Sequence, residues 1–171
     1  ANTGTGKTGA FLIPLIHKVL CDKEQKVLIV APTRELALQI NQELREFSRG
    51  LGIFSICCVG GVGINKQLFE LRQEHNFIIG TPGRLKDLVR RGRITLARFK
   101  TIVLDEADRM LDMGFVADMR FLASLMPREH HTLFFAATVS RDIEGLIKEF
   151  CREPIRVSVK TGDTSKNVEQ D

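Results

Sequence analysis

The feature that most constrains the fold is an alternation of short apolar runs with longer segments of helical periodicity. Six apolar runs rich in Val, Ile and Phe predict strands buried on both faces: 26–32, 54–60, 76–81, 101–106, 132–138 and 155–159. Six segments have apolar residues three and four apart and predict helices: 9–20, 34–50, 65–74, 83–92, 115–126 and 141–151. Alternating strands and helices predict an α/β fold, a parallel sheet with helices on both faces.

The size and composition fit one such unit. The chain has 171 residues, of which 43% are hydrophobic and 27% charged, enough to bury one core and hardly two. We therefore predict one domain over residues 1–159 and a polar tail over 160–171.

The first eight residues, ANTGTGKT, fit a phosphate-binding loop of the form (Gly or Ala)-x-x-x-x-Gly-Lys-(Ser or Thr). Two glycines can adopt positive φ and turn backbone N–H groups toward phosphate oxygens, and the helix that follows points its positive end at the same charge. Lys7 is expected to reach the β and γ phosphates, and the Thr8 hydroxyl to face Mg²⁺. The predicted nucleotide-binding residues are Thr3, Gly4, Thr5, Gly6, Lys7 and Thr8.

This loop normally follows a buried strand, and no residue precedes Ala1 in the sequence. We therefore expect the chain to begin inside the domain. A sheet that lacks a central strand leaves backbone groups unpaired, at a cost of several kcal/mol against a total stability of about 5–15 kcal/mol, so we expect poor stability.

Polar motifs follow the apolar runs one after another. They are APTREL, GG, TPGR, DEAD and AAT, in chain order. In open parallel sheets ligands bind at the carboxyl ends of the strands, so these motifs should meet at one edge.

The run TIVLDE ends in two carboxylates. Asp105 is expected near the phosphate-binding loop, where it can hold Mg²⁺ directly or through water. Glu106 is suited to orient or deprotonate an attacking water. Together with Lys7 these residues predict nucleotide hydrolysis.

Other site chemistry finds little support. The four cysteines, at 21, 57, 58 and 151, have no C-x-x-C spacing, which favours buried free thiols over disulfides or zinc. The pair His130-His131 has no third ligand in view and is expected in a solvated loop. No apolar run is as long as a membrane span and no signal peptide opens the sequence, so we expect a cytoplasmic protein, or a nuclear one if the source is eukaryotic.

The motifs ANTGTGKT, PTRELA, GG, TPGR, VLDEADRMLDMGF and AAT stand in the order and rough spacing of the DEAD-box RNA helicases. The chain resembles the first RecA-like domain of that family from residue 1 to NVEQD, which is similar to the start of the linker to a second RecA-like domain. The resemblance implies an ATP- and Mg²⁺-dependent enzyme that unwinds RNA, with the ATP site between the two domains.

The same resemblance implies an RNA-binding set: Thr33, Arg34, Gly60, Gly61, Thr81, Gly83 and Arg84. Amides, hydroxyls and guanidinium groups near helix N-termini can hold phosphates without reading bases, so binding should be salt-sensitive and largely sequence-independent. The chain has no Trp and no Tyr for stacking bases. The basic segment 83–100 is either a solvated surface or part of the RNA site, and beyond Arg84 the alternatives stay open. The net charge of +4 favours an anionic partner.

One motif departs from the family. The usual Ser-Ala-Thr reads Ala136-Ala137-Thr138, so one hydrogen bond toward the turn of Asp105 to Asp108 is missing, about 0.5–1.5 kcal/mol. The resemblance associates Asp108, Ala136 and Thr138 with coupling of ATP turnover to strand separation. We hypothesise that coupling is weakened, or that a neighbouring residue substitutes.

The family's adenine-recognising Gln motif and its arginine fingers lie outside this sequence. Because such arginines are worth about 10³–10⁵ in rate, we expect weak nucleotide binding, little ATPase activity and no unwinding from these residues alone. Two alternatives stay open: another NTPase of the same loop type, acting on DNA, and a non-catalytic RNA-binding or scaffold module with a vestigial loop.

Overall fold

The structure, a computed structural model, describes residues 6–159. The predicted phosphate ligands Thr3, Gly4 and Thr5 and the predicted tail 160–171 lie outside the described residues.

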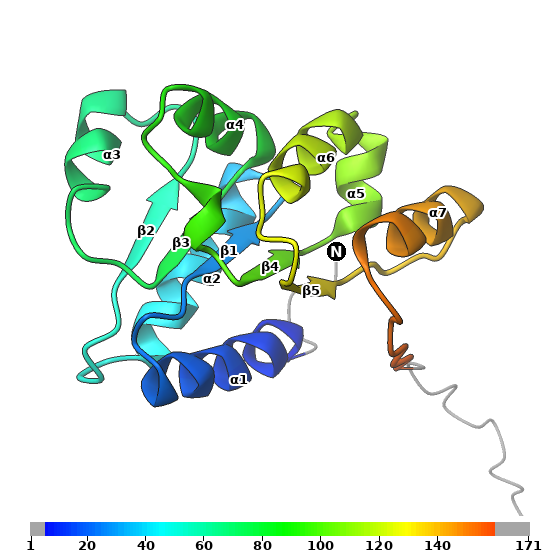
Figure 1. Cartoon of the computed structure of the whole chain (residues 1–171), viewed down its shortest axis with the longest axis horizontal. Helices are drawn as coiled ribbons and strands as arrows, with labels where there is room; N and C mark the ends of the chain where they lie inside the picture. The colour runs from blue at the N-terminus through cyan, green and yellow to red at the C-terminus, as the bar shows by residue number, and fades with distance from the viewer. Residues whose placement is uncertain (1–5, 160–171) are drawn as a thin grey trace, which may run out of the picture.

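A five-stranded parallel sheet forms the centre of the domain (Figure 1). Its strands, in the spatial order β2-β3-β1-β4-β5, are β1 (Val27–Val30), β2 (Ser55–Cys58), β3 (Phe77–Gly80), β4 (Thr101–Leu104) and β5 (His131–Phe134). All four neighbouring pairs are parallel, with the first residues of neighbouring strands in register. The predicted parallel α/β fold is confirmed.

Helices cover both faces of the sheet (Figure 1). They are α1 (Lys7–Cys21), α2 (Arg34–Phe47), α3 (Ile64–Glu70), α4 (Pro82–Arg90), α5 (Ala107–Asp112), α6 (Val116–Ser124) and α7 (Arg141–Phe150), with a 3₁₀ turn η1 (Leu96–Arg98) before β4. Sequence patterning missed α5, because it begins inside the DEAD motif, at Ala107, and its six residues are too few to show a helical period.

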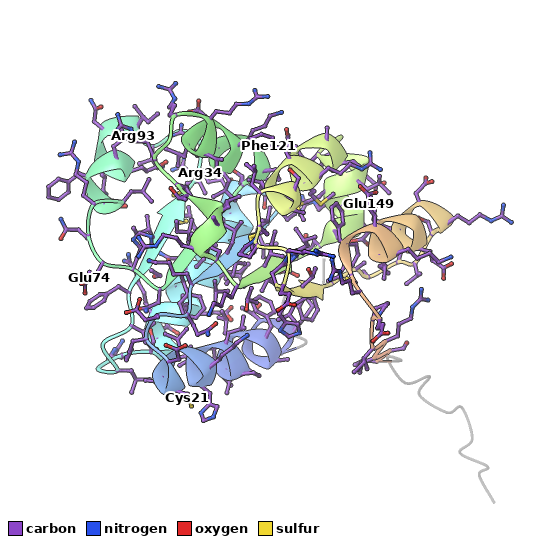
Figure 2. All side chains as sticks on the ribbon, in the orientation of Figure 1. Cys21, Arg34, Glu74, Arg93, Phe121 and Glu149 are labelled. Atoms are coloured by element: carbon purple, nitrogen blue, oxygen red, sulfur yellow. The ribbon has the colours of Figure 1, made fainter. Side chains whose placement is uncertain are left out.

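The period-2 alternation of the strands divides the core into two layers. Val27 and Ile29 pack with α1 and α2 on one face, whereas Leu28 and Val30 pack with α4 to α7 on the other. The central strands β1, β3 and β4 are buried along their whole length. Figure 2 shows the side chains filling the space between sheet and helices.

The predicted strand 155–159 is wrong. These residues form no strand, and Ile155, Val157 and Val159 are 93%, 85% and 86% exposed. A strand needs a neighbour for its backbone N–H and C=O groups, and no segment of the described chain pairs with this one.

Two smaller expectations also need correction. His131 is the first residue of β5, although its side chain is exposed, and the loop holds His130 alone. All four cysteines are free thiols, but Cys58 is buried whereas Cys21 is exposed at the end of α1 (Figure 2). Cys21 lies outside the apolar stripe that faces the sheet.

Candidate functional site

The carboxyl ends of the five strands meet at one edge of the sheet, because the strands are parallel and in register. The motifs that follow the strands therefore lie along this carboxyl edge. They form two groups, one beyond β4 and β5 and one beyond β1, β2 and β3.

Lys7 and Asp105 form the centre of the first group. Lys7 is the first residue of α1, directly after Gly6, which has φ 68 and so occupies the left-handed region that glycine tolerates. The Lys7 ammonium lies 2.8 Å from Oδ1 of Asp105, joining the start of α1 to the end of β4. It also lies 5.9 Å from the ring centroid of Phe135, beyond β5.

Asp105 is a buried carboxylate, with 1% of its surface exposed. Burial is the largest influence and raises its pKa, while Lys7 acts in the opposite direction. Its Oδ1 also accepts the Glu106 backbone N–H at 2.9 Å. The fold therefore holds an acid in a costly environment, where a cation would stabilise the charged form.

Glu106 has φ 48 and ψ 51, a left-handed conformation that side-chain-bearing residues rarely adopt. Such strain is of the order of 1 kcal/mol and is concentrated at functional sites. The residue caps the start of α5, and its Oε2 lies 3.4 Å from the Arg109 guanidinium. The left-handed backbone of Glu106 therefore sets the direction in which its side chain leaves the main chain, next to the buried Asp105.

Asp108 connects the DEAD turn to the segment after β5. Its Oδ2 accepts the backbone N–H of Thr138 at 3.1 Å and the Thr138 hydroxyl at 3.0 Å. Ala136 is half-buried and packs against the core. A direct connection between these two segments therefore exists without a hydroxyl at position 136.

Arg34, Gly60 and Gly61 meet in the second group. The Arg34 guanidinium donates to the carbonyl of Gly60 at 3.4 Å. Gly61 has φ 75, and a β-carbon placed on it would collide with that guanidinium. The Thr33 hydroxyl caps α2 by accepting the Leu36 N–H at 3.2 Å.

Arg84 lies on the first turn of α4, where its guanidinium donates to Oε1 of Gln67 at 3.0 Å. Gln67 is 1% exposed, and its amide nitrogen donates to the carbonyl of Val59 at 2.8 Å. Thr81 precedes α4 without a side-chain capping bond, and Gly83 has open space where a β-carbon would project. The Thr81 hydroxyl, Gly83 and the Arg84 guanidinium, which Gln67 holds by a hydrogen bond, thus lie together at the start of α4.

Within residues 6–159 no hydrogen bond or ion pair joins a predicted residue of the first group to one of the second. The patterning missed two residues of this edge. The sequence did hold a signal for Gln67, since it is a polar residue in the apolar stripe of its helix. It held none for Phe135, which has the pattern of a core residue and packs on Phe11 with ring centroids 5.2 Å apart.

The described residues contain no cluster of three or more His, Cys, Asp or Glu side chains placed to hold a metal. The residues predicted to face Mg²⁺, Thr8 and Asp105, offer a hydroxyl and a carboxylate, the oxygen ligands that Mg²⁺ takes while keeping several waters. None of the helices over 6–159 is long and apolar enough to cross a membrane.

Comparison with known proteins gives consistent matches. The model of the DEAD/DEAH box helicase family matches residues 1–146. A curated protein named DEAD-box ATP-dependent RNA helicase CshA, from Bacillus subtilis strain 168, is 41% identical over 172 aligned positions, which cover 99% of this chain and 35% of that protein.

Two solved structures share the fold. One is described as a hypothetical ATP-dependent RNA helicase from Sulfolobus tokodaii, with TM-score 0.82, 33% identity, and coverage of 90% of this chain and 44% of that one. The other is described as a DEAD box protein from Methanococcus jannaschii, with TM-score 0.83, 37% identity, and coverage of 90% and 42%. The chain spans about a third of the curated relative and less than half of each solved chain.

Proposed function

Because the chain belongs to the DEAD/DEAH box helicase family, we propose that it is the nucleotide-binding RecA-like part of an ATP-dependent RNA helicase. The observation that carries this proposal is the ion pair between Lys7, at the start of α1, and the buried Asp105, at the end of β4. A buried carboxylate beside a lysine at a helix N-terminus is suited to phosphates with a bound cation.

In this proposal Lys7 exchanges its contact with Asp105 for the β and γ phosphates of ATP. The N-terminal amides of α1 and the predicted loop Thr3 to Thr8 surround the phosphates. Asp105 and Thr8 would hold Mg²⁺, which would neutralise the charge that develops on the phosphates. Glu106, whose backbone conformation directs its carboxylate, orients the attacking water.

RNA is held at the second group of the carboxyl edge. Arg34 and Arg84 supply guanidinium groups, and Thr81, Gly61 and Gly83 supply a hydroxyl and close access to the backbone. Thr33 contributes by setting the start of α2, since its hydroxyl is already used as a cap. All these contacts are suited to the phosphate backbone, so sequence preference should be low.

Hydrolysis and unwinding are proposed to need a second RecA-like domain, which would supply arginines to the phosphates. We expect the 171-residue chain to bind Mg²⁺-ATP weakly and to hydrolyse it barely. Activity should rise when a second such domain is joined after Asp171.

The test is a fluorescence titration of the chain with a labelled ATP analogue, in Mg²⁺ and again in EDTA. Lys7→Ala should weaken binding about 10–100-fold, since a hydrogen bond to a charged group is worth about 1.5–3 kcal/mol. Lys148→Ala, which removes an exposed lysine on α7, is the matched control and should leave binding unchanged.

Hydrolysis with and without RNA is then measured for the chain alone and for the two-domain form. Activity confined to the joined form supports the proposal. Binding of RNA with no hydrolysis in either form, and no effect of Lys7→Ala on nucleotide binding, contradicts it and favours a non-catalytic RNA-binding module.

A further inference from the structure

The edge of the sheet opposite the candidate site carries a row of basic residues. Lys26 precedes β1, Lys100 precedes β4 and His130 precedes β5. The Lys100 N–H donates to the Lys26 carbonyl at 3.2 Å, and the His131 N–H donates to the Lys100 carbonyl at 2.8 Å. These residues therefore follow one another across neighbouring strands at the amino edge.

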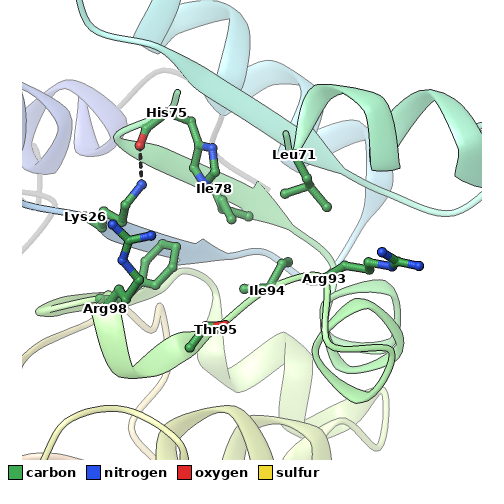
Figure 3. A pocket seen from close by; sticks show the side chains of 9 residues that line it. Lys26, Leu71, His75, Ile78, Arg93, Ile94, Thr95 and Arg98 are labelled. Atoms are coloured by element: carbon green, nitrogen blue, oxygen red, sulfur yellow. Dashed lines mark hydrogen bonds between the residues drawn. The ribbon is translucent and has the colours of Figure 1, made fainter. Parts of the chain in front are cut away.

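A hollow of about 140 Å³ lies at one end of this row (Figure 3). Lys26 and Arg98 lie side by side in it beneath His75, while Arg93, which also lines it, points away. The Lys26 ammonium donates to the His75 carbonyl at 2.6 Å. Burial first, and the nearby Arg98 second, lower the pKa of Lys26.

A second, wider hollow of about 400 Å³ lies at the other end of the row. Lys18, Lys100, Arg128 and Arg152 line it together with His130 and His131, and Glu129 is the one acid among the described residues of its lining. The Lys18 ammonium donates to the Thr101 hydroxyl at 3.2 Å, which fixes it at the end of α1.

We define the amino-edge basic surface as the cations that converge on the two hollows: Lys18, Lys26, Arg98, Lys100, Arg128 and Arg152. None of the ion pairs over residues 6–159 includes any of the six. Acids do lie near: Glu24 and Glu74 influence Lys26, and Lys100 influences Asp22. They act at a distance, and the positive charge of the surface is not neutralised by direct pairing.

The structure also separates the basic segment 83–100 into two parts. Lys86, on α4, pairs with Asp118 of α6 at 2.7 Å, and Arg91 pairs with Asp87 of its own helix at 2.8 Å. Arg98 and Lys100 lie beyond the helix, on the amino-edge basic surface. Arg98 and Lys100 thus face away from the carboxyl edge.

We propose that the amino-edge basic surface binds the phosphodiester backbone of RNA, at a second place remote from the carboxyl edge. This deepens the proposed function and rests on it for the identity of the polyanion. A linear polyanion can occupy both hollows, whereas a single phosphate fills one. Among residues 6–159, none of the large exposed hydrophobic side chains lines either hollow, and such residues would be expected in the core of a protein interface.

The test reverses two exposed cations of the second hollow, Lys100→Glu with Arg152→Glu. The matched control, Arg45→Glu with Arg49→Glu, makes the same change in net charge at exposed positions at the end of α2, which packs on β2 at the far side of the sheet from β5. Binding of a fluorescent oligouridylate to the 171-residue chain is measured by anisotropy at several salt concentrations.

The amino-edge pair should weaken binding at least about tenfold more than the control pair. It should also reduce the slope of log K against log salt by about 0.7 for each phosphate that the surface no longer neutralises. Equal effects of the two pairs on affinity and slope overturn the inference.

Two further arms separate the possible failures. If Arg34→Ala with Arg84→Ala abolishes binding and the amino-edge pair does not, RNA binding at the carboxyl edge stands and the inference fails. If the amino-edge pair alone matters, the inference stands and the proposed carboxyl-edge contacts fail. A calorimetric titration with inorganic phosphate, if it saturates at low concentration in the wild type but not in the amino-edge pair, while RNA binding is unchanged in that pair, shows a small-anion site and overturns the inference.

Discussion

Thr138 donates two hydrogen bonds to a single carboxylate oxygen of Asp108, one from its backbone N–H at 3.1 Å and one from its hydroxyl at 3.0 Å. The two residues lie thirty positions apart, one after β4 and the other after β5. A shift of the DEAD turn would therefore be transmitted to the segment after β5, and vice versa.

Replacing Thr138 by Val removes the hydroxyl bond and keeps the backbone one. Because the pair is exposed, we expect a stability loss of less than about 1 kcal/mol. The number of base pairs opened per ATP hydrolysed by the two-domain form should fall more clearly. Val139→Thr, at an exposed neighbouring position, is the control, and an unchanged ratio in Thr138→Val would show that the bond carries no coupling.

Replacing Ala136 by Ser tests whether the missing hydroxyl weakens coupling. Ala136 packs against the core, so the added hydroxyl reaches the DEAD turn only in a side-chain rotamer that points toward that turn. We expect more unwinding per ATP hydrolysed, with nucleotide affinity unchanged. No gain would mean that the two hydrogen bonds from Thr138 to Asp108 already suffice for coupling.

Replacing Asp105 by Asn should stabilise the fold while abolishing Mg²⁺-dependent nucleotide binding. The neutral amide avoids the cost of a charge that is 1% exposed, and its oxygen can still accept from Lys7. We expect a gain of about 1 kcal/mol, or about 2–4 °C in Tm by calorimetry.

The gain from Asp105→Asn should depend on pH. Burial raises the folded-state pKa of Asp105 above its unfolded value, so the charge destabilises the fold above the folded-state pKa. As pH falls through that pKa toward the unfolded value, the carboxyl takes up a proton and the gain should disappear. Asp112→Asn, which makes the same change at an exposed position, is the control, and a gain from Asp105→Asn that is constant with pH would contradict the buried charge.

Replacing Gly61 by Ala should cost about 1 kcal/mol for the left-handed backbone at φ 75. The new β-carbon also displaces the Arg34 guanidinium, so RNA affinity should fall in the same variant. Gly63→Ala is the control, because Gly63 has φ −53 and open space around it. Urea unfolding and RNA binding are measured for both variants, and equal losses in Gly61→Ala and Gly63→Ala would contradict the prediction.

Replacing Gln67 by Leu should destabilise the chain by about 1–3 kcal/mol, since the buried Val59 carbonyl loses its donor. Arg84 also loses the hydrogen bond that positions its guanidinium. The RNA concentration for half-maximal ATPase stimulation should therefore rise in the two-domain form, with the maximal rate unchanged. Gln67→Glu restores an acceptor for Arg84 and should recover RNA affinity without recovering stability. A fall in stability alone in Gln67→Leu would limit the residue to a structural role.

Much of the fold followed from local patterning. The runs containing Val27–Val30 and Thr101–Leu104 are strands buried on both faces, as three or four consecutive apolar residues beside helical segments indicate. Residues 155–159 carry an equally good strand pattern and form no strand, because a strand exists only with a hydrogen-bonded neighbour. Pairing is a property of the whole sheet and is not contained in the segment.

The candidate site divides in the same way. The placement of Asp105 and Arg34 at the carboxyl edge follows from their positions just after strands. The hydrogen bond between Arg84 and Gln67 joins segments that are distant in the sequence, and so does the contact of Lys7 with the Phe135 ring. No local pattern specifies such contacts. The assignment of roles to these residues remains our proposal.

The strand order β2-β3-β1-β4-β5 has a consequence for synthesis of the chain on the ribosome. The central strand β1 is made before both of its neighbours, β3 and β4, which end at Gly80 and Leu104. At the usual rate of translation the nascent β1 waits roughly 4–15 seconds for its second neighbour. Throughout that interval four consecutive apolar residues present an open edge, so this part of the nascent chain should depend on chaperones until Leu104 has been made.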